Sequence, residues 1–413
     1  MIGEKKKIVV IGAGIVGVST ALRLQEMGKS VCLVDKSRPG QETSFGNSGN
    51  IESSYVLPFS PPSLSKIPSI LLGKNTSARM SFPSGLKSMP WILKFYKESK
   101  KETLIENGRN LRPLLEFSVD EHKVLMKGTD AEKYLCETGR AKLHRSEASF
   151  QASSLERDMA DYYDVPYEVM KRDEFLEREP ALNPVFEKAV IWSGSARLSN
   201  PGKVVEIYAE KFQKQGGEFV QGEVTSLSQQ GEGWQIKTKS GEVFHTEAVV
   251  ICVGPWAKDL LRTVGTHVPL GLKRGYHQHF NASAALNYNI TDADCGYVMS
   301  DMEQGLRITT GAEFADINAE PNPIQIEQVL PYARELMDFG KAKEGDPWMG
   351  SRPCFTDSCP AIGEIKGRKG LWVNIGHGHS GLTIGPSSGR LLAEMMAGAK
   401  TFCDPKPYSP DRF

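Results

Sequence analysis

Three glycines near the N-terminus have the spacing of a turn that binds a dinucleotide. Gly12, Gly14 and Gly17 follow a β-branched run at 7–11 and precede a run with helical periodicity. In such a turn the first glycine permits a tight bend, the second lets a pyrophosphate approach the backbone, and the third lets helix and strand pack closely. The free N–H groups at the helix N-terminus then face the phosphates.

An acidic residue completes this pattern. The predicted helix at 15–27 ends at Gly28, and a second short strand at 30–34 leads into Asp35. A carboxylate at the end of that strand is placed to accept hydrogen bonds from ribose hydroxyls. Strand, helix, strand and acid in this order predict a nucleotide-binding βαβ unit, but the glycines alone do not distinguish FAD from NAD.

The path of the chain after Asp35 favours the longer cofactor. A polar loop at 36–50 replaces the alternation of strands and helices that is usual in an NAD domain. Apolar segments typical of buried strands return only at 248–253 and near the C-terminus, at 371–376. Such a split domain suits a cofactor that lies across several returning segments.

Other elements follow from periodicity, capping and proline content. Asn200 and Pro201 are typical of a helix start, and the prolines between 56 and 90 exclude a long helix there. Helices are expected at about 91–128, 201–215, 324–340 and 386–397, and strands at 218–228, 233–239, 242–253 and 371–376.

Composition limits the class of protein. The chain has 413 residues, which predicts about two domains, and its 50 basic and 50 acidic residues give no net charge to attract nucleic acid. Seven scattered cysteines without a Cys-x-x-Cys pair indicate free thiols in a reducing compartment, and hence a cytoplasmic protein. The apolar run after Lys5–Lys7 is too short and glycine-rich for a signal peptide, and no run is long enough to span a membrane.

Four stretches of this sequence resemble the D-amino acid oxidase superfamily, and most closely the bacterial D-amino acid dehydrogenase catalytic subunits and their hydroxyproline dehydrogenase relatives. They occur in the expected order and the resemblance covers essentially the whole chain. One departure is Asp35, where many relatives have Glu, and a second glycine motif for NAD(P)H is absent. The four stretches are Val9–Asp35, Glu42–Gly49, Gly350–Pro353 with Asp357, Pro360, Ile362 and Gly363, and Gly376–Thr383.

The resemblance implies an α/β fold with FAD as the cofactor. A Rossmann-like FAD-binding domain is expected from the discontinuous segments 1–85, 145–265 and 346–413. An α+β, sheet-based substrate domain is expected from 86–144 and 266–345. The cofactor-binding residues that we expect are Gly12, Ala13, Gly14, Ile15, Val16, Gly17, Asp35, Lys36, Thr43, Ser44, Asn47, Gly49, Val224, Gly254, Gly350, Gly378, His379, Ser380, Gly381, Leu382 and Thr383.

The resemblance also implies the residue that holds the substrate. In this family the Arg of the Gly-x-Arg-Pro motif binds the substrate carboxylate, and Arg352 matches it. A guanidinium fork holds a carboxylate bidentately and does not titrate. The alternative is an arginine that braces a loop through backbone carbonyl groups.

Three further residues are candidates for the active site, each with ordinary packing as the alternative. Tyr276 and His277 lie in a predicted strand whose region faces the active site in relatives, but neighbours on a strand point to opposite faces. Tyr55 lies where it can reach the substrate. His277 and His279 share a face, yet no third ligand is spaced nearby, so we expect no metal.

The implied activity is the FAD-dependent oxidative deamination of a D-amino acid or cyclic imino acid of the proline or hydroxyproline type. Hydride passes from Cα to flavin N5, and the electrons continue to a quinone or another acceptor of the electron-transfer chain. An oxygen-using oxidase of the same fold, acting on glycine, sarcosine or an opine, remains open, as does a flavin-binding partner subunit without turnover.

The proline-rich segment at 56–96 has two interpretations. Its apolar residues either contact a membrane surface, which would place the protein on the cytoplasmic face of the inner membrane, or cover the substrate domain. The sequence does not decide between these, nor does it determine the substrate, its stereochemistry, partner subunits or the oligomeric state.

Overall fold

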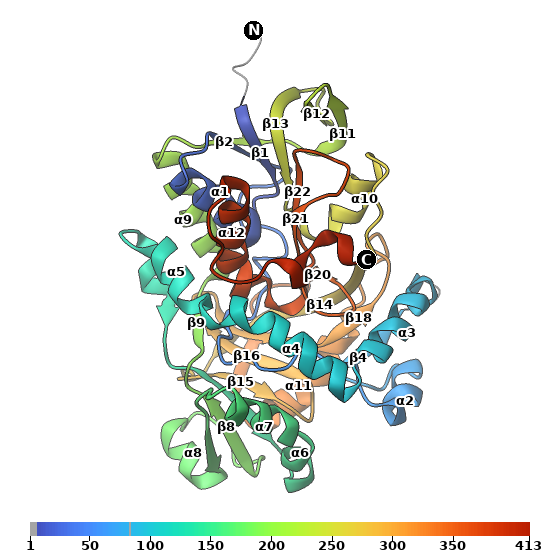
Figure 1. Ribbon diagram of the computed structural model, residues 1–413. Coiled ribbons are helices and arrows are strands. Elements are labelled where there is room, and N and C mark those ends of the chain that lie inside the picture. The colour runs from blue at the N-terminus through green and yellow to red at the C-terminus, as the bar shows by residue number, and fades with distance from the viewer. Residues whose placement is uncertain (1–5, 82–83) are drawn as a thin grey trace.

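Two large sheets, stacked one above the other in Figure 1, organise the molecule. The computed structural model describes residues 6–81 and 84–413. Residues 1–5 and 82–83, which include Lys5 of the N-terminal lysine run and Pro83 of the proline-rich segment, lie outside the described residues.

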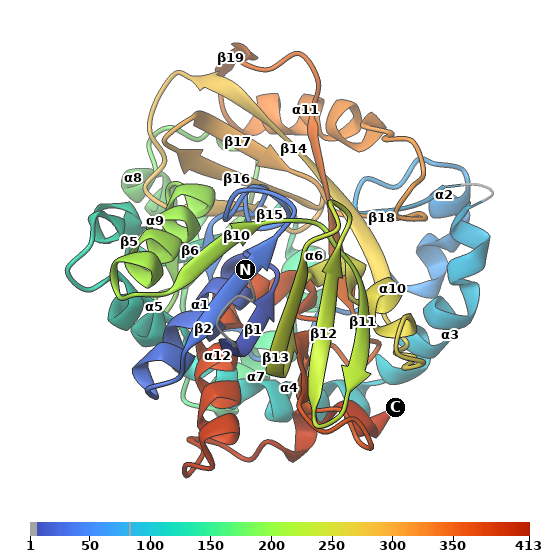
Figure 2. The same ribbon diagram turned by 90° about the horizontal axis from the view of Figure 1, so that it is seen from above.

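Eight strands of the described chain form the first sheet, in the order β10-β2-β1-β13-β12-β11, with β22 beside β13 and β21 beside β22. The strands β1, β2, β10 and β22 and the C-terminal half of β13 are parallel, while β11, β12 and the start of β13 form the meander that faces the viewer in Figure 2. The bounds are β1 Lys6–Ile11, β2 Val31–Asp35, β10 Glu218–Gln221, β11 Val224–Gln230, β12 Gly233–Thr238, β13 Val243–Ile251, β21 Ala361–Glu364 and β22 Leu371–Ile375.

Helices cover one face of this sheet, as expected for central parallel strands that are buried on both faces. Val10 and Val250 contribute to the core under α1 (Ile15–Glu26), α9 (Pro201–Lys214) and α12 (Gly381–Ala397). On the other face Val9 and Val249 pack toward α10 (Ala257–Arg262) and the meander. All four valines are 0% exposed, which confirms the interpretation of 7–11 and 248–253 as buried strands.

The last helix begins earlier than its sequence predicts. α12 starts at Gly381 rather than at 386 and contains Pro386. A proline at this position removes only the N–H that would bond the carbonyl of Leu382. That carbonyl instead lies 2.8 Å from Nε2 of the buried His122, so a side chain of α5 (Ser118–Met126) replaces the lost backbone donor.

Eleven strands of the described residues form the second sheet, in the order β4-β18-β14-β17-β16-β15-β6-β8-β7, with β19 and β20 both paired to the long strand β14. Their bounds are β4 Ala78–Met80, β6 Arg140–His144, β7 Glu168–Lys171, β8 Lys188–Trp192, β14 Gly271–Ala282, β15 Asn289–Asp292, β16 Tyr297–Met302, β17 Gly305–Thr309, β18 Ala312–Phe314, β19 Phe339–Ala342 and β20 Trp348–Cys354.

These pairings correct the predicted division of the chain. The strands β4, β7, β8 and β20 fall in segments assigned to the FAD-binding domain, yet they pair in the second sheet. The strand β6, which is one of the two partners of β8, lies inside 86–144 as expected. Strand partners are distant in sequence, so a division by continuous segments could not place them.

Short helices surround the second sheet and the gap between the sheets. The predicted helical stretch 91–128 divides into α3, α4 and α5, and α11 ends before the strand β19 instead of reaching 340. A small sheet of β3 (Asn50–Ile51), β9 (Ala196–Leu198) and β5 (Leu135–Cys136) joins the two halves. The remaining helices are α2 Ile67–Leu71, α3 Met89–Glu98, α4 Lys101–Glu116, α6 Glu147–Ala152, α7 Ser154–Tyr162, α8 Arg172–Arg178 and α11 Ile324–Leu336.

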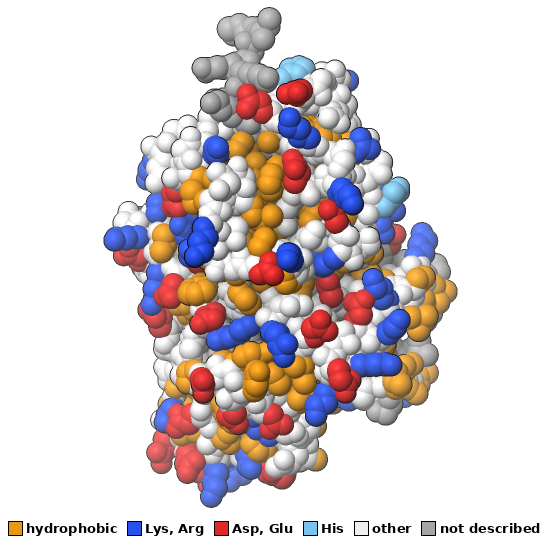
Figure 3. All heavy atoms as spheres, in the orientation of Figure 1, with side chains coloured by type: hydrophobic (Ala, Val, Ile, Leu, Met, Phe, Trp, Pro, Cys, Tyr) orange, Lys and Arg blue, Asp and Glu red, His pale blue; other side chains and the backbone are white. Residues whose placement is uncertain are grey.

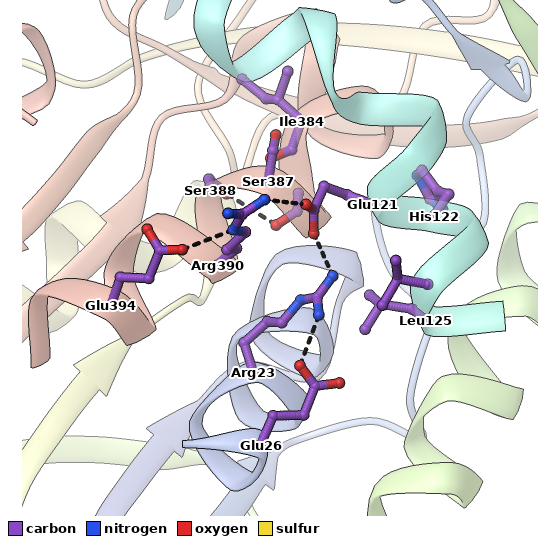
Figure 4. Close-up of polar contacts among 12 residues, drawn as sticks. Arg23, Glu26, Glu121, His122, Leu125, Ile384, Ser387, Ser388, Arg390 and Glu394 are labelled. Carbon is purple, nitrogen blue, oxygen red and sulfur yellow. Dashed lines mark hydrogen bonds and ion pairs between the residues drawn. The ribbon is translucent and has the colours of Figure 1, made fainter. Parts of the chain in front are cut away.

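A buried carboxylate ties three helices of the upper half together (Figure 4). Glu121 of α5 accepts from Arg23 of α1 and, at 2.8 Å, from Arg390 of α12. Each arginine has a second acidic partner on its own helix, Glu26 or Glu394, at 2.7 Å. Breaking a buried pair of this kind typically costs about 3–5 kcal/mol, so the network fixes the helix that follows the glycine turn.

None of the seven cysteines, all of which lie within the described residues, forms a disulfide bond. In the described part of the chain, no helix combines the length and apolar character that crossing a membrane requires. No group of three or more possible metal ligands occurs among the described residues.

Candidate active site

A cavity of about 930 Å³ runs between the two sheets. Its upper part is lined by the C-terminal ends of β1, β2 and β13, where open α/β sheets bind their ligands. Its lower part is lined by β14, β16, β17 and β20 of the second sheet. The volume is near the upper end of the roughly 300–1,000 Å³ that is usual for small-molecule sites.

The glycine turn has the geometry that its spacing predicts. Gly12 has a φ of +108°, and a Cβ atom there would lie 2.4 Å from the carbonyl oxygen of Cys252. A Cβ on Gly17 would lie 1.7 Å from the carbonyl oxygen of Gly12, so this glycine permits helix and strand to touch. Gly14 instead lines the cavity, with Ser44 Oγ 3.2 Å from the position of its Cβ.

Asp35 lies beside the turn and faces the cavity. Its two carboxylate oxygens accept from the backbone N–H groups of Ala13 and Ser37, at 2.5 and 2.8 Å. Burial raises the pKa of its carboxyl group above the usual value. The neighbouring Lys36 places Nζ 3.5 Å from the ring centroid of Trp256, which also lines the cavity.

The loop of residues 43–50 passes along the cavity and is bonded to both halves of the molecule. Ser44 Oγ accepts from the N–H of Ile15 at 3.0 Å, and Thr43 Oγ1 donates to the carbonyl oxygen of Ser351 at 3.1 Å. Gly49 has a φ of +82°, and its N–H donates to Asn47 Oδ1 at 2.8 Å. These hydrogen bonds hold the backbone of the loop in one conformation along the cavity.

A polar row on the second sheet holds this loop, and the sequence analysis did not identify it. Strand register places Arg307, Ser300 and Asn289 side by side on one face. Arg307 Nη1 donates to the carbonyl oxygens of Phe45 and Asn47, at 3.0 and 2.5 Å. Ser300 Oγ and Asn289 Nδ2 both donate to the carbonyl oxygen of Ser48, at 2.8 and 3.0 Å. The alternation of side chains within each strand could have shown which residues share a face. The sequence could not show which strands are neighbours, so it could not reveal the row.

The row continues outward through the buried His279 to Glu344 at the surface. Arg307 Nε donates to His279 Nε2 at 2.9 Å, and Nδ1 of that ring lies 2.5 Å from Glu344 Oε1. Because Nε2 accepts from a guanidinium, the proton of the neutral ring is on Nδ1 and is donated to Glu344. Burial and the neighbouring Arg307 lower the pKa of His279.

The loop before α12 closes the cavity from the other side. The Nε2 atom of His379 is buried and has no hydrogen-bond partner among the described residues, and the ring stacks on Phe59 with centroids 4.4 Å apart. His377 Nε2 lies 3.0 Å from Ser388 Oγ, and burial lowers the pKa of this histidine to about 3. Thr383 Oγ1 bonds the backbone of Glu52, which ties this loop to the end of the 43–50 segment.

Arg352 enters the cavity from β20. Its guanidinium crosses β14 at Gly275, where a Cβ atom would lie 2.4 Å from Nη2. It donates to the carbonyl oxygens of Gly311 at 2.8 Å, Thr310 at 3.4 Å and Arg274 at 3.5 Å. Within the described residues no carboxylate pairs with it. Gly275 and Gly311 were not recognised in the sequence, since nothing local marks a glycine that a distant arginine must cross.

The structure separates the other candidate catalytic residues. Tyr55 lines the cavity. Tyr276 points away from it, donating to Glu313 Oε2 at 2.6 Å and accepting from the N–H of Asn322 at 2.9 Å. The expectation that Tyr276 acts in the site is therefore corrected, because its position on β14 puts it on the opposite face.

His277 lies on the cavity face of β14, but it is covered. It is 2% exposed and stacks on Trp348, whose ring centroid is 4.9 Å away and which does line the cavity. Burial lowers the pKa of His277 to about 2, so the ring is neutral at physiological pH. It supports the wall of the cavity from behind Trp348.

Most of the predicted cofactor-binding residues meet in this one cavity. Those that line it are Gly12, Gly14, Ile15, Val16, Asp35, Lys36, Thr43, Ser44, Asn47, Val224, Gly254, Gly350, Gly378, His379, Ser380, Gly381 and Leu382. The other four, Ala13, Gly17, Gly49 and Thr383, lie directly behind this lining and bond or pack against it.

Comparison with known proteins agrees with this architecture. The model of the DAO family of FAD-dependent oxidoreductases matches residues 7–395, so the chain belongs to that family. It is 28% identical to a D-amino-acid oxidase of Bradyrhizobium diazoefficiens, with 99% of each chain covered. It is also 28% identical to a D-amino acid dehydrogenase of Rhizobium rhizogenes, with 98% of this chain and all of the relative covered.

Solved structures share the fold at lower identity. Glycine oxidase from Geobacillus kaustophilus superposes with a TM-score of 0.76 at 22% identity, with 99% of both chains covered. L-Proline dehydrogenase from P. horikoshii gives a TM-score of 0.73 at 19% identity, with 99% of this chain and 98% of that chain covered. The fold is thus a Rossmann-like FAD-binding half with a sheet-based second half.

The cofactor is FAD, and the residues present fit it. The glycine turn offers backbone N–H groups to a pyrophosphate, and Asp35 offers a carboxylate to a ribose. The unpartnered Nε2 of His379 and the N-terminus of α12 border the middle of the cavity, where a ring system requires fixed polar groups. The protein is an FAD-dependent oxidoreductase.

Proposed function

We propose that this protein oxidises the Cα–N bond of a small D-amino acid or of a cyclic imino acid of the proline or hydroxyproline type. FAD held by the glycine turn and Asp35 would supply the acceptor for the hydride from Cα, and the electrons would continue to a quinone or another acceptor. The names of the relatives, which include a D-amino-acid oxidase and D-amino acid dehydrogenases, support this substrate class. A glycine oxidase and a proline dehydrogenase have the same fold.

The observation that carries the proposal is the guanidinium of Arg352 in the cavity. Three backbone carbonyl groups hold it in place, yet they leave its charge without an anionic partner among the described residues. A fixed cation without a counter-ion is a binding point for a carboxylate. The carbonyl contacts are those of a bracing arginine, but bracing alone would not require the guanidinium to line a cavity.

The other residues of the cavity favour a neutral reacting amine. Burial holds the pKa of His377 at about 3 and that of His277 at about 2, so neither ring carries a charge near pH 7. Burial also lowers the pKa of His379, well below its usual value. These three rings therefore add no positive charge to the cavity. A neutral amine with an available lone pair can lose hydride without a strong base.

An anaerobic absorbance titration tests the proposal. We expect the flavin bands near ~450 nm to bleach on addition of one class among D-amino acids, L-amino acids, and D- and L-proline or hydroxyproline. Slow return of colour in air identifies a dehydrogenase, and fast return identifies an oxidase. A bound flavin that no amine reduces would contradict the proposal and favour a partner subunit without turnover.

A variant at Arg352 shows whether this residue holds the carboxylate. Arg352→Met should keep the flavin but lower kcat/KM by about 10²–10³-fold, since it removes a bidentate charge-assisted pair worth about 3–4 kcal/mol. Arg352→Lys should retain part of the activity, because the charge remains but the fork is lost. The exposed Arg262, which forms a surface ion pair with Asp259, provides a matched control in Arg262→Met.

We also propose that the surface around α2 and α3 contacts an anionic membrane, where a quinone acceptor would be found. Leu64, Leu72, Leu86 and Leu93 are between 53% and 69% exposed there. Residues 56–101 carry eight Lys or Arg and a single acidic residue, in a chain of zero net charge. Figure 3 shows hydrophobic and basic side chains together at this edge of the molecule. Apolar burial combined with several lysines is the pattern of interfacial binding.

Sedimentation with lipid vesicles tests this surface. The protein should sediment with vesicles that contain an anionic lipid and should be released by salt, because about 1 kcal/mol per lysine is electrostatic. Replacing Leu72 and Leu93 by Ser should weaken binding, whereas Tyr162→Ser, at an exposed residue on α7, should not. Equal binding to neutral and anionic vesicles, or none, would overturn the membrane proposal.

A further inference from the structure

The lower end of the cavity carries four charged side chains that the proposed function does not use. Glu52, Arg140, Lys142 and Glu156 all line it, with side chains between 5% and 23% exposed, and we call them the charged cluster. Two are acidic and two are basic, so the ionised cluster has no net charge. Burial opposes ionisation of Glu156, but Lys142 and Arg140 outweigh it and hold the pKa of this carboxyl below its usual value.

Within the charged cluster, Arg140 is short of partners. Lys142 Nζ and Glu156 Oε2 satisfy each other at 2.6 Å. Arg140 has only longer ion pairs, with Nε 3.3 Å from Glu52 Oε1 and Nη2 3.6 Å from Glu156 Oε1. Charge-assisted hydrogen bonds are usually about 2.7–2.9 Å long, and Nε of this arginine has no hydrogen-bond partner among the described residues. An unsatisfied buried donor costs about 1–3 kcal/mol, so the arrangement is suited to a ligand.

Comparison with its neighbours shows that Arg140 does not serve to hold the loop. Register places it next to Asn289, as the outermost member of the polar row on the second sheet. Asn289, Ser300 and Arg307 each donate to the 43–50 loop within 3.0 Å. Arg140 instead stacks on Trp192, with its Cζ 5.4 Å from the ring centroid, and lines the cavity.

The cavity is long enough to bring one substrate to both arginines. Register places His277, Thr309, Val298, Thr291 and Lys142 in a second row, parallel to the polar row, and the last four line the cavity. Five strands spaced by about 4.8 Å give this floor a length of roughly 19 Å. That span, between the strand that Arg352 crosses and the strand that carries Arg140, far exceeds the distance between the carboxylate and the hydroxyl of serine. A substrate that contacts both arginines therefore needs a long, extended side chain.

We propose that Arg140 donates hydrogen bonds to an oxygen on the side chain of the substrate. The substrate is then an amino acid whose side chain is long enough to carry a hydroxyl, carbonyl or amide oxygen from Cα to the far end of this floor. This inference rests on the proposed function, in which Arg352 holds the α-carboxylate. An uncharged oxygen leaves the charged cluster neutral, whereas a second carboxylate would give it a net negative charge in a poorly solvated place.

Matched substrate pairs test the inference on the intact flavoprotein. Each pair differs by one oxygen-bearing group at the end of an extended side chain: norvaline and glutamine, and norleucine and 6-hydroxynorleucine, each as both enantiomers. We expect the oxygen-bearing member to have a kcat/KM at least tenfold higher in one or more pairs, because a site built to donate a hydrogen bond discriminates against a substrate that lacks the acceptor. In Arg140→Met this ratio should fall toward one, and in Arg140→Lys it should be intermediate.

The control and a second variant make the outcome decisive. Arg178→Met, at an exposed arginine that forms an ion pair with Glu168 away from the cavity lining, should leave the ratio unchanged. Glu156→Gln gives the cluster one positive charge, so the preference should move toward a side-chain carboxylate, as in glutamate. A wild-type ratio near one in every pair overturns the inference, and so does an Arg140→Met enzyme that retains the wild-type ratio. If no amine bleaches the flavin, the proposed function itself fails, which is a different result from equal rates within a pair.

Discussion

The two sides of the cavity bind their ligands with different atoms. On the upper side, recognition depends on backbone groups and on the absence of side chains, as at Gly12, Gly14 and Gly17. On the lower side the groups that we propose for substrate recognition are long side chains such as Arg352 and Arg140, which come from strands far apart in the chain. Backbone recognition needs one continuous segment, whereas side-chain recognition needs correct pairing of distant strands. The residues of the upper side can therefore be recognised from a short sequence motif. The residues of the lower side can differ between enzymes that act on different substrates.

The largest effect is expected where a glycine is replaced on the upper side. Gly17→Val should abolish flavin binding, because its Cβ would overlap the carbonyl oxygen of Gly12 at 1.7 Å. Gly345→Val is the matched control, since nothing lies within 4 Å of the position of its Cβ. The ratio of absorbance near ~450 nm to that at 280 nm in the purified protein measures bound flavin. A Gly17→Val protein with a full complement of flavin would contradict the view that this wall depends on backbone contact.

A smaller effect on flavin binding is expected where a side chain of the lower sheet holds the loop that lines the cofactor side of the cavity. Arg307→Met removes the donors to the carbonyl oxygens of Phe45 and Asn47, which hold the cofactor loop. Losing charged hydrogen bonds of about 1.5–3 kcal/mol should weaken FAD binding about 10–100-fold. Fluorescence of released flavin during dialysis measures this, with Arg262→Met as the surface control. If flavin affinity is unchanged while KM rises, Arg307 would act on the substrate instead.

The smallest effect concerns pH and compares one buried histidine from each side. Burial holds the pKa of His122, on α5, and of His144, on β6, at about 4, below the usual 6.5. As the pH falls from about 7 to about 4, these two histidines bind protons in the unfolded chain but remain neutral in the folded chain. The free energy of unfolding therefore decreases. Urea midpoints at pH 7.5 and 5.0 should show this loss, and His122→Gln and His144→Gln should each reduce it. A loss that neither variant reduces would assign it to other groups.

Much of the upper half could be predicted from local sequence. The strands 7–11 and 248–253, the helix after the glycine turn and the Asn200 cap all appear near their expected positions, since each depends on periodicity and neighbouring residues. The start of α12 was wrong by five residues, because Pro386 is tolerated only through a donor from His122. That donor belongs to another helix and leaves no local signal.

The lower half shows the opposite limit. The sequence placed Tyr276 and His277 on opposite faces of one strand, and the structure agrees, but the sequence could not say which face meets the cavity. It did not identify Arg307, Arg140 or Gly275, whose roles depend on which strands are neighbours. The division into domains failed at β7 and β8 for the same reason, since their partner strands lie far away in the chain.

By itself, the sequence determined a dinucleotide turn, an acid for the ribose and an arginine in a recognisable motif. These depend on spacing within one βαβ unit or one short segment, where chain geometry fixes the relative positions of residues. Only the tertiary structure decided that Arg352 crosses Gly275 into the cavity, that Tyr276 faces away and that Arg140 ends the polar row with unused donors. Such relations depend on the order and register of strands, which long-range packing sets and no local pattern records.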